Sequence, residues 1–381
     1  MKSRALWVAA LVLFPSLGQA RPVPVGRYVE IPYGVSEGHP WRTGGGDPRR
    51  THRSEHRAPE SAPTQQWTAR VGVGRVFSPT IAEDGTIYVA SQRGVAAVAA
   101  DGTVRWERAV GLVSGTPSIT PDGGIAFGTQ PDELLVLRQG SARSRARIGG
   151  GVRGSPLVLD DGSIVLAAYD QAIHRFDADG RRMFRTPVTT QVRGTVARSG
   201  DLLVVPAGRE LLWISVRGTI VRTTSLGSSI ELGPAVADDG VAWVVTAEGV
   251  LVAVTPAGRV VVRTDLDARP SRASNLAIAD DGSLRLGTAD AGLLCIGAGG
   301  TERWRLTDRG TLAGEVIVDA DGVALLVNSD GAMLAVEPDG DVRWQASLGT
   351  RTDAAPVLGA DGTIYTTTFG GTLQAWRYSR P

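Results

Sequence analysis

The feature that most constrains this chain is an internal repeat with a period of about 40 residues. Its marker is an Asp-Gly turn that recurs at Asp84, Asp122, Asp161, Asp239, Asp281, Asp321 and Asp361. A degenerate copy, Ser199-Gly200-Asp201, fills the one gap, so that successive copies lie 38, 39, 38, 40, 42, 40 and 40 residues apart. The 381-residue chain therefore contains eight copies of one unit rather than two or three unrelated domains.

Each copy is predicted to form four short strands, called A to D. In the clearest copy we place them at Ser78–Ala82, Thr86–Ala90, Val95–Ala99 and Thr103–Arg108. These runs are rich in β-branched residues and too short for helices. The Asp-Gly turns supply the positive φ angles that tight antiparallel hairpins need.

Eight such units predict an all-β, eight-bladed β-propeller with four-stranded antiparallel blades. A sheet of about 40 residues cannot bury both faces alone, and stacking twisted copies into a ring buries them. The last copy, Ala355–Tyr378, lacks a D strand, while Gln66–Val71 resembles a D strand without a copy of its own. We expect this N-terminal strand to complete the last blade and close the ring. An open solenoid, the alternative, leaves two bare edges.

The N-terminus divides into two further segments. Residues 1–20 have a basic start, the apolar run Ala5–Phe14 and small residues at Gly18 and Ala20, which predicts a signal peptide cut after Ala20. A buried N-terminal helix is the alternative. No cysteine follows the apolar run, so we expect an exported chain, periplasmic or extracellular, that is not lipid-anchored and has no transmembrane segment.

Residues 21–64 are rich in proline, glycine and arginine and lack periodicity, which indicates an extended arm or linker before the propeller of residues 65–381. This segment holds His39, His52 and His56, three of the four histidines. His52 and His56 have a metal-ligand spacing only on a helix, and no helix pattern covers them. We interpret the arm as solvated, and an arm draped over the folded body is the alternative.

The repeat resembles the pyrroloquinoline-quinone-type propeller repeat of quinoprotein dehydrogenases and of the assembly lipoprotein BamB. The likeness depends on Ser78–Val89, on Asp-Gly-x-x-x-Trp at Asp101–Trp106 and Asp339–Trp344, and on the lead-in Trp41–Thr51. It implies that the D-strand tryptophan docks between neighbouring blades. It also implies pyrroloquinoline quinone with calcium as the cofactor of a dehydrogenase, the alternative function.

The sequence shows little catalytic chemistry. Cys295 is the one cysteine, so the adjacent cysteine pair of many alcohol-oxidising relatives is absent, and we predict no cofactor and no metal. His174, in a predicted C strand, lacks a neighbouring nucleophile, and we interpret its role as structural or as that of a surface residue. Asp177 and Asp319 precede Asp-Gly turns without the later ligands of a calcium loop. The formal net charge of +1 argues against a nucleic-acid partner.

One set of positions varies between copies and is the candidate binding site. Strand A should line the central channel, with the D–A and B–C connections on one face of the ring. Charged D–A residues are Arg153, Arg193, Glu231 and Asp353, and variable B–C turns contribute Arg93, Tyr169 and Arg209. A repeat that varies on one face has that face free for recognition; the alternative is ordinary solvated polarity.

These observations predict a monomeric, non-catalytic binding scaffold of the cell envelope. Its partner would be an envelope protein or a small polar ligand. Besides the quinone-dependent dehydrogenase, a carbohydrate-binding or lyase propeller is a second alternative, which the aromatic content of 6% disfavours because sugars stack on rings.

Overall fold

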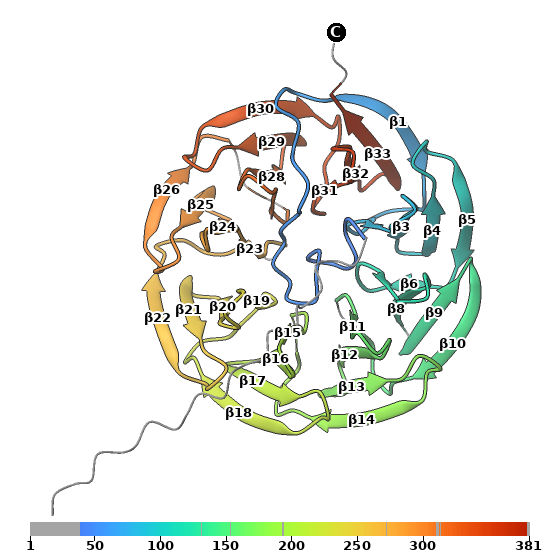
Figure 1. Cartoon of the computed structure of the whole chain (residues 1–381), viewed down its shortest axis with the longest axis vertical. Coiled ribbons are helices and arrows are strands. Elements are labelled where there is room, and N and C mark those ends of the chain that lie inside the picture. The colour runs from blue at the N-terminus through green and yellow to red at the C-terminus, as the bar shows by residue number, and fades with distance from the viewer. Residues whose placement is uncertain are drawn as a thin grey trace, which may run out of the picture. The chain divides into compact units, whose positions relative to one another are not determined.

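The computed structural model describes residues 39–378, apart from Pro131, Arg153, Arg193, Arg272, Gly310, Thr311 and Ala313. The predicted signal peptide lies outside the described residues. Those residues form thirty-three strands and no helix, arranged as eight sheets around a central axis (Figure 1). The predicted eight-bladed propeller is confirmed.

The first four blades have the following strands. Blade 1 contains β2 (Thr80–Ile81), β3 (Ile87–Ala90), β4 (Gly94–Val98) and β5 (Val104–Ala109). Blade 2 contains β6 (Leu112–Val113), β7 (Ser118–Ile119), β8 (Ile125–Gln130), β9 (Glu133–Arg138) and β10 (Ser141–Arg147). Blade 3 contains β11 (Leu157–Val158), β12 (Ile164–Ala168), β13 (Ala172–Phe176) and β14 (Arg182–Pro187). Blade 4 contains β15 (Ala197–Ser199), β16 (Leu202–Ala207), β17 (Glu210–Ser215) and β18 (Ile220–Ser225).

The last four blades repeat this plan. Blade 5 contains β19 (Ala235–Val236), β20 (Ala242–Val245), β21 (Val250–Val254) and β22 (Val260–Asp265). Blade 6 contains β23 (Leu276–Ile278), β24 (Leu284–Gly287), β25 (Leu293–Ile296) and β26 (Glu302–Leu306). Blade 7 contains β27 (Ile317–Val318), β28 (Ala324–Val327), β29 (Ala332–Val336) and β30 (Val342–Ser347). Blade 8 contains β31 (Val357–Leu358), β32 (Ile364–Thr367), β33 (Thr372–Arg377) and the N-terminal β1 (Thr64–Arg70).

The ring closes through its first strand, as predicted. β1 pairs antiparallel with β33, with Thr68 opposite Gln374 and Arg70 opposite Thr372. Blade 8 thus has the order β1-β33-β32-β31, with its outermost strand supplied from the other end of the described chain. The innermost strands are shorter than predicted: β2 covers two residues, whereas the sequence predicted five.

Side chains of the outer strands dock on the next blade, which confirms the implied role of the tryptophans. The indole nitrogens of Trp67 and Trp304 donate to Ala100 O (3.0 Å) and Pro338 O (2.7 Å) in the following C–D turns. Trp344 instead donates to Pro59 O (2.7 Å), so the segment leading into β1 takes the place of the C–D turn that blade 8 lacks.

Because of this docking, we expect two glycine-to-alanine substitutions to lower the free energy of unfolding by different amounts. Gly102 has a φ of +90°, and a Cβ there would lie 2.7 Å from the Trp67 ring. Gly123 has a φ of +78°, and a Cβ there would meet nothing within 4 Å. Gly123→Ala should therefore cost only backbone strain, about 1–2 kcal/mol, whereas Gly102→Ala adds overpacking and should cost about 2–4 kcal/mol. Equal shifts in chemical unfolding would contradict the proposed docking.

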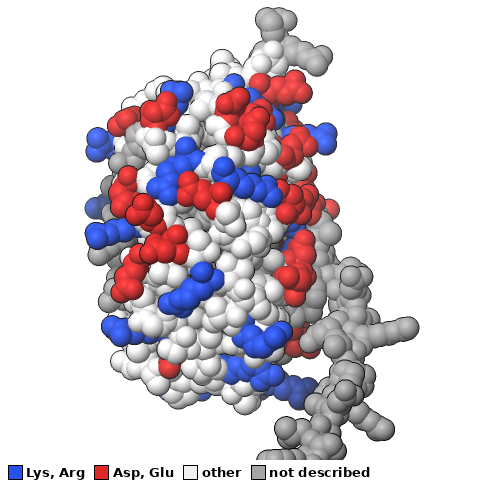
Figure 2. Space-filling view, turned by 90° about the vertical axis from the view of Figure 1, so that its left-hand side faces the viewer, with Lys and Arg blue, Asp and Glu red and all other residues white. Residues whose placement is uncertain are grey.

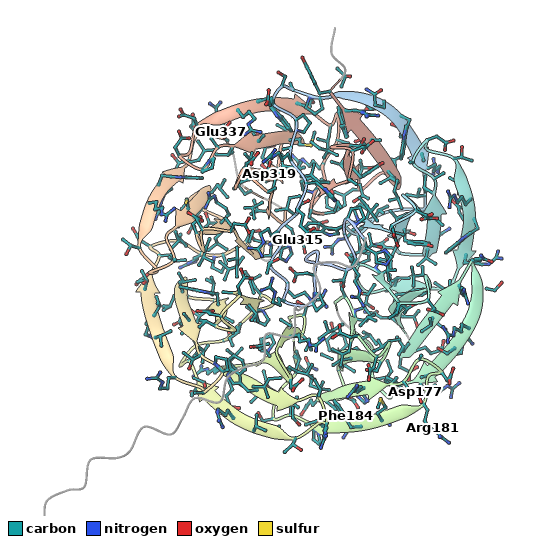
Figure 3. All side chains as sticks on the ribbon, in the orientation of Figure 1. Asp177, Arg181, Phe184, Glu315, Asp319 and Glu337 are labelled. Atoms are coloured by element: carbon teal, nitrogen blue, oxygen red, sulfur yellow. The ribbon has the colours of Figure 1, made fainter. Side chains whose placement is uncertain are left out.

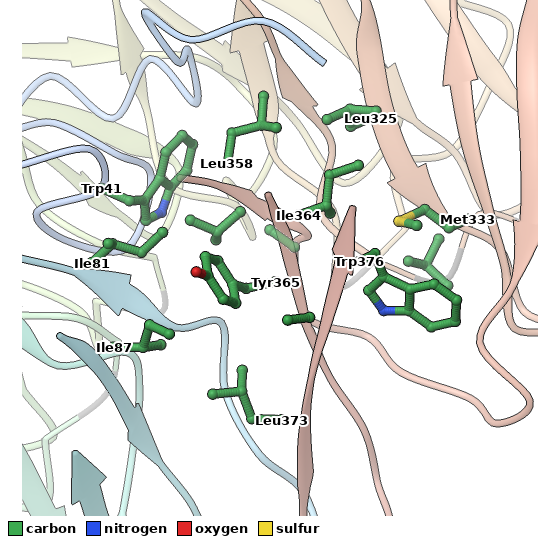
Figure 4. Close-up of a cluster of buried hydrophobic side chains, with 14 of the residues drawn as sticks. Trp41, Ile81, Ile87, Leu325, Met333, Leu358, Ile364, Tyr365, Leu373 and Trp376 are labelled. Atoms are coloured by element: carbon green, nitrogen blue, oxygen red, sulfur yellow. The ribbon is translucent and has the colours of Figure 1, made fainter. Parts of the chain in front are cut away.

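The largest apolar cluster lies where the ring closes (Figure 4). Tyr365 and Trp376 from blade 8 pack with Ile81 of blade 1 and Met333 of blade 7. Trp41, which is only 1% exposed, belongs to the same cluster although it precedes the propeller in sequence. The lead-in is therefore part of the core.

Residues 41–58, here called the plug segment, cross the centre of the ring (Figure 1). Its carbonyls accept hydrogen bonds from inner-strand N–H groups of separate blades, such as Pro48 O from Arg198 and Thr51 O from Ile278, both at 2.8 Å. The interpretation of this part of the arm as solvated is wrong. Short inner strands expose unpaired backbone donors, and the plug segment satisfies them.

The side of the outer wall seen in Figure 2 carries charges of both signs without a large field of either. Every basic residue after Lys2 is an arginine. Several outer-strand arginines bind aspartates of the repeating turns, as in Arg303–Asp281 (2.8 Å) and Arg105–Asp84 (3.3 Å). Since the described residues contain no helix, none of them forms one suited to crossing a membrane.

Candidate functional site

The central channel is reduced to a well of about 220 Å³. Its wall comes from the D–A connections of all eight blades, and Gly44, Arg50 and His52 of the plug segment also line it. The well opens on the face that carries the D–A connections and B–C turns, here called the open face. The plug segment bonds the inner strands toward the opposite side, where Arg57 pairs with Asp321 of an A–B turn (2.9 Å).

Arg50 fastens the plug segment to the ring. Its guanidinium donates to Val196 O (3.1 Å), Ser155 O (3.0 Å) and Pro156 O (3.1 Å) in the wall. It also donates to Gly44 O and to Thr43 Oγ1 (2.8 Å) within the segment. The residue is 2% exposed. All five guanidinium N–H groups can thus be satisfied internally, which makes Arg50 a structural tie rather than a ligand-binding group.

Arg75 and Asp353 form the main ion pair of the well. Two guanidinium nitrogens of Arg75 reach the two carboxylate oxygens of Asp353, at 3.1 and 2.7 Å. Arg75 also lies over the Phe77 ring, 5.0 Å from its centroid. Burial raises the pKa of Asp353, an effect that Arg75 partly offsets. The pair joins the D–A connections of blades 8 and 1 across the closure.

Glu315 points toward the centre of the ring (Figure 3). Its Oε2 accepts a hydrogen bond from Ser78 Oγ (3.1 Å), and Ser78 Oγ in turn accepts from the Ala355 N–H (2.9 Å). Burial raises the pKa of Glu315 to about 7, because the charged form loses water, and the negative charge of Asp353 adds to the effect. The well therefore contains a carboxyl group that titrates near neutral pH.

This shift predicts a stability difference that depends on pH. The folded-state pKa of Glu315 lies above its ordinary value of 4.5, so folding favours the protonated form. The loss of stability caused by ionising this buried carboxyl group is absent below pH 4.5, and it grows as the pH rises through 7. The free energy of unfolding of Glu315→Gln should equal that of the parent protein at pH 4. At pH 8 it should be higher than that of the parent by roughly 1–3 kcal/mol. Thermal unfolding of both proteins at both pH values checks this prediction. The same stability difference between variant and parent at pH 4 and pH 8 would contradict it.

Two other polar groups of the well lack hydrogen-bond partners. His52 Nδ1 and Ser114 Oγ are buried atoms without one in the described structure. His52 is 8% exposed, and burial together with the Arg50 charge lowers its pKa to about 3, so its imidazole is neutral at physiological pH. Buried polar atoms without a hydrogen-bond partner are uncommon in folded proteins, so each one needs an explanation.

The structure brings some of the predicted site residues together. Glu231 and Asp353 both line the well. Arg209 and Glu231 line one groove at the end of blade 4, formed by its B–C turn and the D–A connections before and after it, which confirms that the D–A and B–C connections share one face. Arg93 and Tyr169 lie on B–C turns outside the well. Arg153 and Arg193 lie outside the described residues.

Sequence reasoning missed Glu315, Arg75, Arg50 and His52. A signal for Glu315 was present, since it occupies the position of Ser78 in the repeat, where the other copies have serine, threonine, glycine, alanine or asparagine. Arg75 lies one position before the aligned site. Arg50 and His52 had no signal, because nothing local shows that the plug segment enters the ring.

A calcium-bound quinone needs a set of converging oxygen ligands. Calcium takes six to eight oxygen ligands, and no group of three or more acidic, histidine or cysteine side chains converges in the described part of the chain. Asp353 is engaged by Arg75. Cys295 is buried within blade 6, where Arg285 Nη1 lies 2.9 Å from its sulfur, and it is not part of the well.

Comparison with known sequences identifies one family. The family described as outer membrane protein assembly factor BamB matches residues 94–219 and 198–380. Together these matches cover blades 2 to 7, three of the four strands of blade 8, and the last two strands of blade 1. No curated protein sequence matches the chain significantly.

Solved structures share the fold at low sequence identity. BamB from Moraxella catarrhalis has 16% identity and a TM-score of 0.67, covering 84% of this chain and 98% of that one. A europium-containing methanol dehydrogenase has 13% identity and a TM-score of 0.72, with coverages of 90% and 98%. The quinohemoprotein alcohol dehydrogenase from Comamonas testosteroni has 14% identity and a TM-score of 0.75, with coverages of 91% and 82%. At such identities the likeness indicates the fold alone.

Proposed function

Because this chain belongs to the family described as outer membrane protein assembly factor BamB, we propose that it is an exported, non-catalytic binding scaffold of the cell envelope. It would bind an envelope protein or a small polar ligand through the open face. The observation that carries this proposal is the plug segment, which fills the other side of the channel and leaves one accessible well surrounded by connections that vary between blades.

Site-directed photo-crosslinking in cells tests the proposal. A photoreactive residue replaces Tyr169 or Arg209 on the open face. In matched controls it replaces Asp179 or Arg217, which are exposed residues of C–D turns in the same two blades but on the opposite face. We expect a discrete adduct from the open-face positions only. Adducts of equal yield from both faces, or from neither, would refute a binding role for this face.

The quinone-dependent dehydrogenase is the competing function, supported by the fold likeness to two alcohol-oxidising enzymes. Incubation with pyrroloquinoline quinone and calcium, followed by absorbance spectra and a dye-linked assay with alcohols and sugars, decides between them. The scaffold proposal expects no dye reduction above the free cofactor. A glycan array tests the carbohydrate-binding alternative, for which we expect no signal.

A further inference from the structure

Glu315 is a carboxylate of the well that lacks a basic partner at ion-pair distance among the described residues. Arg75 is close enough to influence its titration but is bound to Asp353 through two nitrogens. Arg50 is also near, but its N–H groups are directed to backbone carbonyls and Thr43. Neither arginine can neutralise Glu315 without breaking its own contacts.

The two buried polar atoms of the well without a hydrogen-bond partner can also accept hydrogen bonds. Neutral His52 presents a lone pair at Nδ1 when its proton is on Nε2, and Ser114 Oγ accepts as well as donates. The lining of the well thus holds a carboxylate and two further acceptors, a composition that suits a ligand that is both cationic and rich in donors. A primary ammonium, with three N–H groups and one charge, has these properties in the smallest volume.

The size and composition of the molecule agree with such a ligand. A well of about 220 Å³ admits a short amine. The chain has no lysine after Lys2, so no internal ammonium is available for Glu315 from the propeller. An ammonium partner for Glu315 would therefore be supplied by a ligand.

We propose that the well binds a primary ammonium group, with Glu315 as its carboxylate partner. This assignment rests on the proposed binding role and specifies the chemistry of that site. The ammonium belongs either to a free small amine or to a lysine side chain that a protein partner inserts. Binding stabilises the Glu315 carboxylate and releases its proton when the pH is below about 7. Among the described residues, the other titratable groups that line the well are Arg50, Arg75, Asp353, His52 and Glu231.

Titration calorimetry with n-butylamine tests this proposal, and n-butanol serves as the uncharged control. We expect saturable binding of the amine and none of the alcohol. At pH 6 the measured enthalpy should differ between buffers of different ionisation enthalpy, reporting proton release, and at pH 9 that difference should vanish. Glu315→Gln should weaken binding at least tenfold. Glu248→Gln, a matched change on an exposed B–C turn outside the well, should leave it unchanged.

Several results would overturn the assignment. They are equal affinity in Glu315→Gln, equal binding of butanol, tighter binding of methylguanidine, or no amine binding up to about 10 mM. A blocked lysyl peptide distinguishes the two sources. Binding at least tenfold tighter than butylamine indicates a partner's lysine, and equal or weaker binding indicates a free amine. The crosslinking pattern of the open face does not depend on Glu315, so failure here is distinct from failure of the proposed function.

Discussion

Arg50→Met should lower the free energy of unfolding by at least about 3 kcal/mol. The substitution keeps an unbranched side chain in place but removes the donors to Val196, Ser155, Pro156 and Gly44. Each buried carbonyl that loses its partner costs about 1–3 kcal/mol. Because the segment also supplies carbonyls to inner strands of several blades, loosening it exposes further unpaired donors. Chemical denaturation gives the free energy directly.

Arg49→Met is the matched control for this prediction. Arg49 is adjacent in the plug segment, but its guanidinium pairs with Asp238, whose side chain is 66% exposed. Solvent-exposed ion pairs of this kind contribute about 0–1 kcal/mol. Protease cleavage within residues 41–58 should accelerate in Arg50→Met and not in Arg49→Met. If the free energy of unfolding falls by the same amount in both variants, the hydrogen bonds of Arg50 do not anchor the plug segment.

Ala69→Asp should open the ring or prevent stable folding. Ala69 lies in β1 opposite Leu373, is 6% exposed and belongs to the cluster at the closure. An unpaired carboxylate there should cost about 3–5 kcal/mol, as for other buried charges left without a partner. Release of β1 would also leave β33 as a bare edge that can pair with other molecules. We expect a lower unfolding midpoint and concentration-dependent association in sedimentation velocity.

Arg70→Asp controls for charge and position. It places the same carboxylate on the next residue of β1, whose side chain is exposed. We expect its free energy of unfolding to differ from that of the parent protein by no more than about 0.5 kcal/mol, as for ordinary surface substitutions. A monomeric Ala69→Asp variant with normal stability would mean that β1 is not needed for closure.

The blades and their closure could be predicted from sequence because both are encoded locally. Each Asp-Gly turn fixes a hairpin, and each β-branched run between turns forms a strand, so the eightfold copy number fixes the ring. The unpaired D-like strand near Trp67 indicated the closure because a four-stranded unit was visibly one strand short. The length of the inner strands could not be predicted, because it depends on how closely eight blades converge at the axis.

The residues of the well could be predicted only in part, because only those at aligned positions of the repeat are encoded locally. Glu231 and Asp353 lie at aligned positions of the repeat, so topology alone brings them to the well. Glu315 departs from the repeat at the Ser78 position, a local signal that points to a special role. The pairing of Arg75 with Asp353 joins residues 278 positions apart and depends on the ring being closed.

The sequence by itself determined the repeat, the number of blades and the strand that closes them, because short-range turn chemistry and hydrophobic patterning specify each unit. Only the tertiary structure decided where residues 41–58 lie. Their hydrogen bonds go to strands from Ile81 to Val318, which come together only after the ring has formed. A segment without periodicity carries no local record of such distant partners, and the well whose floor it forms exists only in the closed ring.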